Sequence, residues 1–227
     1  MRHLLTLADV QANEIDRIFA ITEDLKTKYA AGLREPLLPG RVMALLFEKP
    51  SLRTRVSFEA GMIHLGGSSL FLGDDVGFGA RESLGDFGRV LSQYVDVIVV
   101  RAFLHKTVRD LVQYSSCSVI NGLTDDAHPC QALADLYTLK ELFGRLAGRT
   151  LAYIGDGNNV ARSLAVASAL FDLSFLLAAP PDYDFPEVFR SRFEEAFPGR
   201  PLVVEHDPLA AVAGAHVVYT DVWASMG

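Results

Sequence analysis

The sequence contains few cysteines and no long hydrophobic stretch. Cys117 and Cys130 are its only cysteines, which excludes a disulfide framework and favours a reducing compartment. No apolar run approaches the roughly 20 residues of a membrane-spanning helix, and no apolar core of a signal peptide follows Met1 to Leu4. We therefore expect a cytoplasmic protein that does not bind a membrane.

Basic residues are too few for a general nucleic-acid binder. The chain of 227 residues contains 21 Lys and Arg against 28 Asp and Glu, a formal net charge of −7. Because proteins that bind the phosphate backbone carry a basic face, nucleic acid is not an expected partner. With 50% hydrophobic residues, a disordered chain is excluded, and a core is available for one large domain or two small ones.

Short apolar runs alternate with segments of helical periodicity along the chain. Ile15, Ile18 and Phe19 recur at helical spacing within a first helix over 12–29, and the run 42–47 indicates a strand that is buried on both faces. Further strands are expected at 68–72, 97–100, 119–120, 150–154, 173–178, 202–205 and 217–220, and further helices at 53–65, 82–94, 107–114, 129–143, 160–171, 187–197 and near 209. This alternation predicts an α/β fold with parallel sheets.

The pattern restarts once, after a junction at 144–149. We therefore predict two α/β lobes, at residues 1–145 and 146–227. The chain ends directly after its last expected strand, at Gly227. Because ligand-binding loops lie at the carboxyl ends of strands, we expect the natural chain to continue beyond this point.

A cluster of anion-binding side chains follows the first expected strand. Residues 47–55 read Phe-Glu-Lys-Pro-Ser-Leu-Arg-Thr-Arg, and a helix is expected to begin near Arg53. A helix N-terminus presents unpaired N–H groups and the positive end of the helix dipole. Ser51 and Thr54 add hydroxyl donors, while Arg53 and Arg55 add forked guanidinium groups. The alternative is an ordinary N-cap with two solvated arginines, but this density of donors favours phosphate binding.

His128 and Gln131 form a second pair of polar groups, at the start of a later expected helix. They lie three positions apart in His-Pro-Cys-Gln-Ala-Leu-Ala-Asp and so share a helix face. An imidazole can donate to a carbonyl oxygen, and a side-chain amide can recognise an amide-like NH2 group. The alternative is a capping His beside an incidental Gln. A metal site of Asp125, Asp126 and His128 is less favoured, because no further ligands follow at a recognisable spacing.

These segments resemble the motifs of a known enzyme family. Residues 47–55 resemble the carbamoyl-phosphate signature of the aspartate and ornithine carbamoyltransferases, although the commoner form has Thr in place of Leu52. His-Pro-Cys-Gln resembles the family's His-Pro-x-Gln motif, and Arg101 follows the strand after which the family places a ligand-binding arginine. The resemblance implies a carbamoyl-phosphate site of Ser51, Leu52, Arg53, Thr54, Arg101, His128 and Gln131, with Thr54, Arg101 and His128 as the catalytic residues.

Two segments of the second lobe resemble the ornithine branch of the family. Residues 155–161 resemble its Gly-Asp-Gly-Asn-Asn turn, and residues 221–227 resemble its Asp-Val-Trp-x-Ser-Met-Gly loop. By this resemblance Asn159 holds the α-carboxylate of ornithine and Asp221 pairs with the α-ammonium, while Ser225 and Met226 line the same pocket. The aspartate branch would instead need basic residues here, to receive a second carboxylate.

The glycine turn has a competing interpretation as a dinucleotide site. Gly155-x-Gly157 after a strand supplies two glycines of that fingerprint. Val160 stands at the third glycine position, and the acidic residue expected at the end of the next strand is replaced by Ala178 and its neighbours. A nicotinamide-dependent oxidoreductase is therefore less favoured than a transferase.

The resemblance implies two Rossmann-like lobes, with an active site in the cleft between them and carbamoyl phosphate and ornithine as substrates. The implied reaction yields citrulline and phosphate, needs no metal or organic cofactor, and takes place in a homotrimer. The family's His-Cys-Leu-Pro motif is absent from residues 1–227, so the chain by itself is expected to form little citrulline. The alternatives are a non-catalytic phosphate-binding fragment, or a transferase that acts on another amine such as N-acetylornithine.

Overall fold

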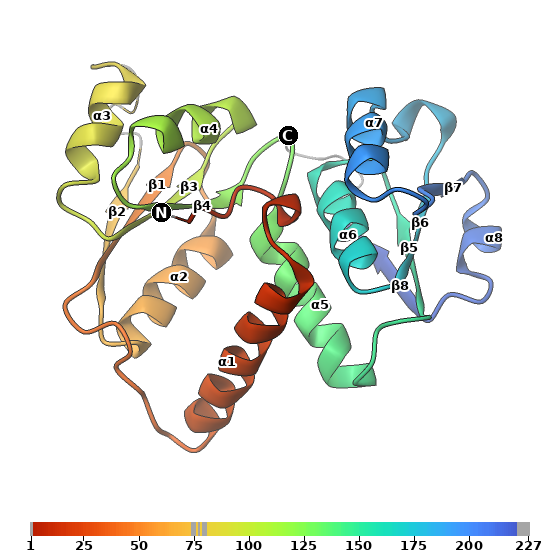
Figure 1. The fold of residues 1–227 in the computed structure, drawn as a ribbon, viewed down its shortest axis with the longest axis horizontal. Coiled ribbons are helices and arrows are strands. Elements are labelled where there is room, and N and C mark those ends of the chain that lie inside the picture. Colours follow the sequence, from red (N-terminus) through yellow and green to blue (C-terminus); the bar gives the residue numbers. More distant parts are fainter. Residues whose placement is uncertain (1, 74–75, 77, 79–80, 222–227) are drawn as a thin grey trace. The chain divides into compact units, whose positions relative to one another are not determined.

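Two four-stranded parallel sheets organise the chain in the computed structural model, which describes residues 2–73, 76, 78 and 81–221 (Figure 1). The chain divides into two compact units. The first unit contains Met1–Leu5 and Asn13–Asp125, and the second contains Thr6–Ala12 and Asp126–Gly227. Among the described residues, none of the helices has both the length and the apolar character needed to cross a bilayer.

The first unit carries its sheet in the strand order β2-β1-β3-β4. Its strands are β1 (Val42–Phe47), β2 (Ser68–Leu72), β3 (Val97–Arg101) and β4 (Ser118–Leu123), and its helices are α1 (Ala12–Ala30), α2 (Leu52–His64), α3 (Leu84–Leu91) and α4 (His105–Tyr114). Met43 and Leu45 of β1 pack toward Met62 of α2, whereas Leu46 packs with Leu111 of α4 on the opposite face. Helices thus cover both faces of the sheet, which explains the continuous apolar run of β1.

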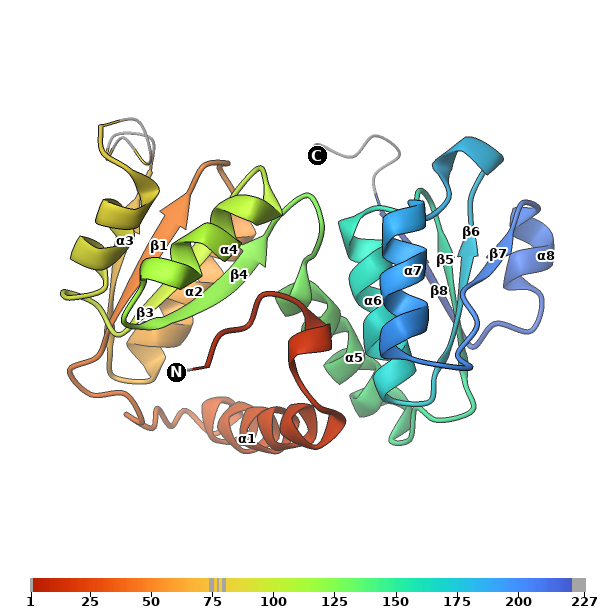
Figure 2. The ribbon, with the colours of Figure 1, turned by 45° about the horizontal axis from the view of Figure 1, so that its top comes forward.

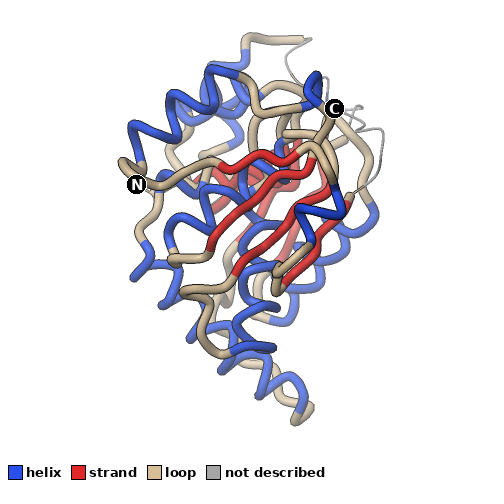
Figure 3. Tube along the Cα trace, turned by 90° about the vertical axis from the view of Figure 1, so that its right-hand side faces the viewer, coloured by secondary structure: helices blue, strands red, loops and turns tan. Residues whose placement is uncertain are grey.

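The second unit repeats the architecture in the strand order β7-β6-β5-β8. Its strands are β5 (Thr150–Ile154), β6 (Ser174–Ala178), β7 (Val203–Glu205) and β8 (Val217–Thr220), and its helices are η1 (Leu7–Asp9), α5 (Pro129–Phe143), α6 (Asn159–Leu170), η3 (Pro181–Tyr183), α7 (Glu187–Ala196) and α8 (Pro208–Val212). Helices α6 and α7 lie on one side of this sheet and α8 on the other (Figure 2). Figure 3 shows the strands of the unit side by side, with helices around them.

The expected order of strands and helices is confirmed, with local exceptions. The helix expected over 82–94 is shorter, because the Ser83 hydroxyl caps it at its start and it ends after Leu91. Val90 of this helix and Tyr94 beyond its end are 54% and 76% exposed. In α1, Ile18 is likewise exposed.

Strand β4 is longer than the two residues expected at 119–120. The second half of the strand contains Asn121 and Gly122, which have low strand propensity, so the sequence pattern did not predict it. Asn121 is fully buried, and its side chain donates to the carbonyl of Leu5, 2.9 Å away. The strand is thus completed by a contact from 116 residues away in the chain.

Each sheet has one switch point, where the chain stops adding strands on one side of the first strand and continues on its other side. From β1 the chain adds β2 on one side and then crosses to β3 on the other, and from β5 it adds β6 and β7 before β8. Phe47 pairs with Arg101 at the first of these points, and Ile154 pairs with Thr220 at the second. Ligands of open α/β sheets bind outside the carboxyl ends of the strands at such switch points.

Candidate active site

The first switch point is followed by the N-terminus of α2. Ser51 is its N-cap residue, and the Ser51 hydroxyl oxygen accepts from the N–H of Thr54 at 3.4 Å and donates to the Thr54 hydroxyl at 3.0 Å. The N–H groups of Leu52 and Arg53 lie in the first turn, where the helix has no carbonyl to offer them. The Leu52 side chain is 78% exposed, so Leu52 can serve an anion through its backbone rather than through its side chain.

Two arginines of this turn have different surroundings. Arg55 donates to Glu59 at 3.2 Å, and its guanidinium lies 3.7 Å from the centre of the Phe71 ring. Arg53 is exposed and makes no ion pair within the described part of the chain. Arg55 therefore stabilises the contact between α2 and β2, whereas Arg53 is available to a ligand.

Arg101 ends β3 next to this turn. Val100 pairs with Asn121 and Arg101 with Leu123, so Gly122 is an extra residue of β4 and forms a bulge. Bulges of this kind redirect neighbouring side chains. The Nε atom of Arg101 is buried and makes no hydrogen bond to any described residue. Burial lowers the pKa of this guanidinium. A buried donor without an acceptor is costly, so the position suits an anionic ligand.

His128 and Gln131 lie at the start of α5, in the second unit. His128 is the N-cap residue, and its backbone N–H donates to the Ser163 hydroxyl at 2.8 Å. Its side chain does not cap the helix, so the capping role considered as an alternative is wrong. The Gln131 side-chain NH2 donates to the Asp135 carboxylate at 3.0 Å. Sequence reasoning assigned no role to Asp135, although its spacing of four residues from Gln131 places both on one face.

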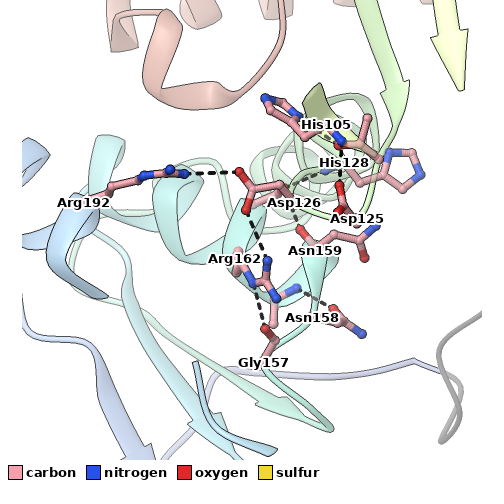
Figure 4. A network of polar contacts seen from close by, with 12 residues as sticks. His105, Asp125, Asp126, His128, Gly157, Asn158, Asn159, Arg162 and Arg192 are labelled. Carbon is pink, nitrogen blue, oxygen red and sulfur yellow. Dashed lines mark hydrogen bonds and ion pairs between the residues drawn. The ribbon is translucent and has the colours of Figure 1, made fainter. Parts of the chain in front are cut away.

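The carboxylates that could have formed a metal site with His128 have other partners. Asp125 accepts from the backbone N–H of His105 at 2.6 Å. Asp126 pairs with Arg162 at 3.2 Å and with Arg192 at 3.6 Å (Figure 4). Within the described residues there is no group of three His, Cys, Asp or Glu side chains arranged for a metal ion.

The second switch point carries the asparagine turn. The Asn158 side-chain oxygen accepts from the N–H groups of Val160 and Ala161, at 2.9 and 3.0 Å, and so caps α6. Asn159 is the first residue of that helix and is half-buried. The pairing of Ile154 with Thr220 brings Asp221, the residue after β8, to the same edge of the sheet.

Gly157 has a packing role in the turn. Its N–H donates to the carbonyl of Tyr183 at 2.8 Å. A Cβ atom at Gly157 would come within 2.8 Å of the backbone of Asp184 and Phe185. The second glycine of the Gly-x-Gly pair is thus explained by close backbone packing, without any phosphate ligand.

Ser225 and Met226 lie outside the described residues. Cys117 is buried in the core of the first unit, as expected for a small apolar side chain. Burial raises the pKa of the Cys130 thiol to about 12. Neither cysteine is therefore suited to act as a nucleophile.

Comparison with known proteins relates both halves of the chain to one enzyme family. Residues 2–141 match the carbamoyl-P binding domain of the aspartate/ornithine carbamoyltransferases, and residues 147–227 match their Asp/Orn binding domain. The chain is 48% identical to the ornithine carbamoyltransferase of Anoxybacillus flavithermus and 50% identical to that of Geobacillus stearothermophilus. In both alignments the whole of this chain covers 73% of the relative.

Solved structures show the same relationship. The ornithine carbamoyltransferase of Pyrococcus furiosus superposes with a TM-score of 0.95 at 44% identity, over all of this chain and 73% of that one. The enzyme of Thermus thermophilus gives a TM-score of 0.87 at 41% identity, over 97% of this chain and 74% of that one. Sequence, domain order and fold therefore agree, and the chain belongs to the aspartate/ornithine carbamoyltransferase family.

Proposed function

We propose that this protein transfers the carbamoyl group of carbamoyl phosphate to the δ-amine of ornithine, which gives citrulline and phosphate. The observation that carries the proposal is the buried, unpartnered Nε atom of Arg101, at the switch point that leads into the capped N-terminus of α2. The family domains matched by the chain and the ornithine carbamoyltransferases similar to it support the choice of substrates.

The leaving phosphate is held by Ser51, by the N–H groups of Leu52 and Arg53, by the Arg53 guanidinium and by Thr54. In the reaction the neutral δ-amine forms a bond to the carbamoyl carbon, and charge builds on the carbonyl oxygen. Thr54, Arg101 and His128 donate to that oxygen, and one such donor typically contributes roughly 3–4 kcal/mol. The bond to the phosphate oxygen then breaks, the phosphate leaves with the electron pair of that bond, and the amine passes one proton to the departing phosphate. Gln131 orients the carbamoyl NH2 group. The rest of the rate enhancement comes from positioning the two substrates.

The acceptor site lies at the second switch point in this proposal. Asn159 binds the α-carboxylate of ornithine and Asp221 its α-ammonium, with Ser225 and Met226 as further lining residues. Asp221 disfavours N-acetylornithine, because an acetylated α-nitrogen carries no positive charge. By the same family relationship we propose a homotrimer in the cytoplasm, with a domain boundary near residue 145.

Binding and product formation test the proposal together. Calorimetry is expected to show carbamoyl phosphate binding that Arg101→Ala weakens at least tenfold, with an unchanged circular dichroism spectrum. In a version of the chain extended to the full length of its relatives, and with carbamoyl phosphate present, ornithine is expected to give citrulline, and aspartate to give no carbamoyl-aspartate. Equal binding by the wild type and Arg101→Ala, or a preference for aspartate, would contradict the proposal.

A further inference from the structure

The orientation of the Gln131 amide is fixed by one hydrogen bond within its own helix. Its Nε2 atom donates to Oδ1 of Asp135 at 3.0 Å, one turn further along α5. An ionised carboxylate only accepts hydrogen bonds, so the NH2 end of the amide must face Asp135 while that carboxyl is charged. The Oε1 end is then turned away, and it makes no hydrogen bond to any described residue.

The surroundings of the Asp135 carboxylate are expected to lower the stability of the folded protein. Its Oδ2 atom is buried and has no hydrogen bond of ordinary geometry to a described residue. The Tyr219 hydroxyl interacts with this carboxyl, and the Tyr219 ring stacks on Tyr153 with their centres 5.5 Å apart. The negative charge of Asp221 also acts on Asp135. A half-satisfied buried carboxylate destabilises a fold relative to an apolar residue, so its presence calls for a role other than packing.

We infer that Asp135 is a positioning residue, which locks the Gln131 amide so that only its carbonyl oxygen is offered to the substrate. This inference rests on the proposed function, in which Gln131 faces the carbamoyl group. A carbamoyl group has a carbonyl oxygen on one side and an NH2 group on the other, with nearly the same shape. An amide that is free to turn could bind either side. A locked acceptor accepts only the NH2 side, and it therefore directs the carbonyl oxygen toward the oxyanion donors.

The fixed orientation of the Gln131 amide also allows the site to discriminate between acyl phosphates. An acyl phosphate with a methyl group in place of the NH2 group has nothing to donate to Oε1. A buried acceptor left without a donor costs free energy, so the site discriminates against such a ligand. Asp135 thus determines which acyl phosphates bind, without touching the substrate itself.

Carbamoyl phosphate and acetyl phosphate are the probes for this role, because they share the phosphate and differ at the NH2 position. Calorimetric affinities of both are compared for the wild type, Asp135→Leu and Asp135→Asn. The asparagine variant keeps an oxygen that accepts from Gln131, and it is the matched control. We expect Asp135→Leu to lower the carbamoyl-to-acetyl affinity ratio about tenfold and to leave acetyl phosphate binding unchanged. Asp135→Asn is expected to keep the ratio within about twofold.

Several outcomes would overturn the inference. One is an unchanged ratio in Asp135→Leu, and another is equal weakening of both ligands, which a merely structural role would cause. A loss in Asp135→Asn as large as in Asp135→Leu would also contradict it. A wild type that does not bind carbamoyl phosphate would instead refute the proposed function.

A measurement on the wild type covers the case in which Asp135→Leu does not fold. The side-chain amide protons of Gln131 are followed by nuclear magnetic resonance as carbamoyl phosphate is added. Because they face Asp135, their shifts and their protection from exchange are expected to change little. Large shifts of these protons would show that the NH2 end contacts the ligand, which would refute the lock.

Discussion

The carboxylate of Glu48 accepts a hydrogen bond of 2.6 Å from the backbone N–H of Phe103, 55 residues further along the chain. The N–H of Glu48 donates in turn to the carbonyl of Arg101 at 2.8 Å. Glu48, which follows β1, thus forms hydrogen bonds both to Arg101 at the end of β3 and to Phe103 just beyond it. Because Arg101 lies inside this pair of bonds, the position of its backbone depends on Glu48.

Replacement of Glu48 by alanine is therefore expected to weaken phosphate recognition without direct contact to the ligand. Removing the carboxylate frees the segment 101–103, and the loss of one hydrogen bond of about 1 kcal/mol corresponds to about fivefold weaker binding. Calorimetry with carbamoyl phosphate measures the change. Glu48→Gln keeps an acceptor oxygen and is expected to bind nearly as the wild type does. Equal binding by Glu48→Ala and Glu48→Gln would show that the bond has no such effect.

The two arginines of the α2 turn give a matched pair of variants. Arg53→Ala is expected to weaken carbamoyl phosphate binding by roughly 1.5–3 kcal/mol, the range for hydrogen bonds to charged groups. Arg55→Ala removes the contacts to Glu59 and Phe71 and is expected to leave the affinity nearly unchanged. Isothermal titration calorimetry of both variants with carbamoyl phosphate measures the two affinities. A larger effect from Arg55→Ala than from Arg53→Ala would reverse the assignment.

Asp221 is expected to govern the affinity for ornithine alone. Loss of one partner of a desolvated charge pair typically costs roughly 2–5 kcal/mol. In a version of the chain extended to the full length of its relatives, Asp221→Asn should therefore raise the KM for ornithine strongly and leave the affinity for carbamoyl phosphate unchanged. Asp172→Asn, which alters an exposed carboxylate that pairs with Arg200, is the control. An ornithine KM that barely moves, or an equal effect on both substrates, would exclude Asp221 from the acceptor site.

These contacts differ in how far the sequence predicts them. The bounds of β1 and α5 follow from periodicity, since an apolar run and a Pro at the first helical position leave little choice. The difference between Arg53 and Arg55 does not follow, because it depends on Phe71 in another strand. Glu48 was also missed, since its partner lies 55 positions away. Asp135 was missed as well, although its spacing of four residues from Gln131 within one helix was a signal that could have found it.

The stability of the fold is expected to depend on the charge of Asp135. Burial raises the pKa of this carboxyl and Asp221 raises it further, while the Gln131 and Tyr219 contacts act in the opposite direction. The folded state therefore binds the proton more tightly than the unfolded state does. Stability from this group is present at acid pH, and it is lost as the pH rises from the unfolded pKa through the raised, folded pKa.

Asp135→Asn removes this loss and should be the more stable protein at pH 7.5. Urea denaturation of both proteins at pH 7.5 and pH 5 measures the difference. The advantage of the variant is expected to shrink at pH 5, where more of the wild-type carboxyl is protonated. A variant that is less stable at pH 7.5, or an advantage that is equal at both pH values, would contradict this assignment.

Replacement of glycine by alanine is expected to have opposite effects on stability at Gly157 and at Gly61. A Cβ atom at Gly157 would come within 2.8 Å of backbone atoms of Asp184 and Phe185, so Gly157→Ala must displace the turn that carries Asn159. Overpacking of this kind typically costs 1–3 kcal/mol, which we take as the rough size of the loss. Gly61 lies within α2 and has no atom within 4 Å of the added carbon. Gly61→Ala should therefore stabilise the protein by up to about 1 kcal/mol. Denaturation midpoints of the two variants test the pair, and a Gly157→Ala protein as stable as the wild type would show that the close approach is not needed.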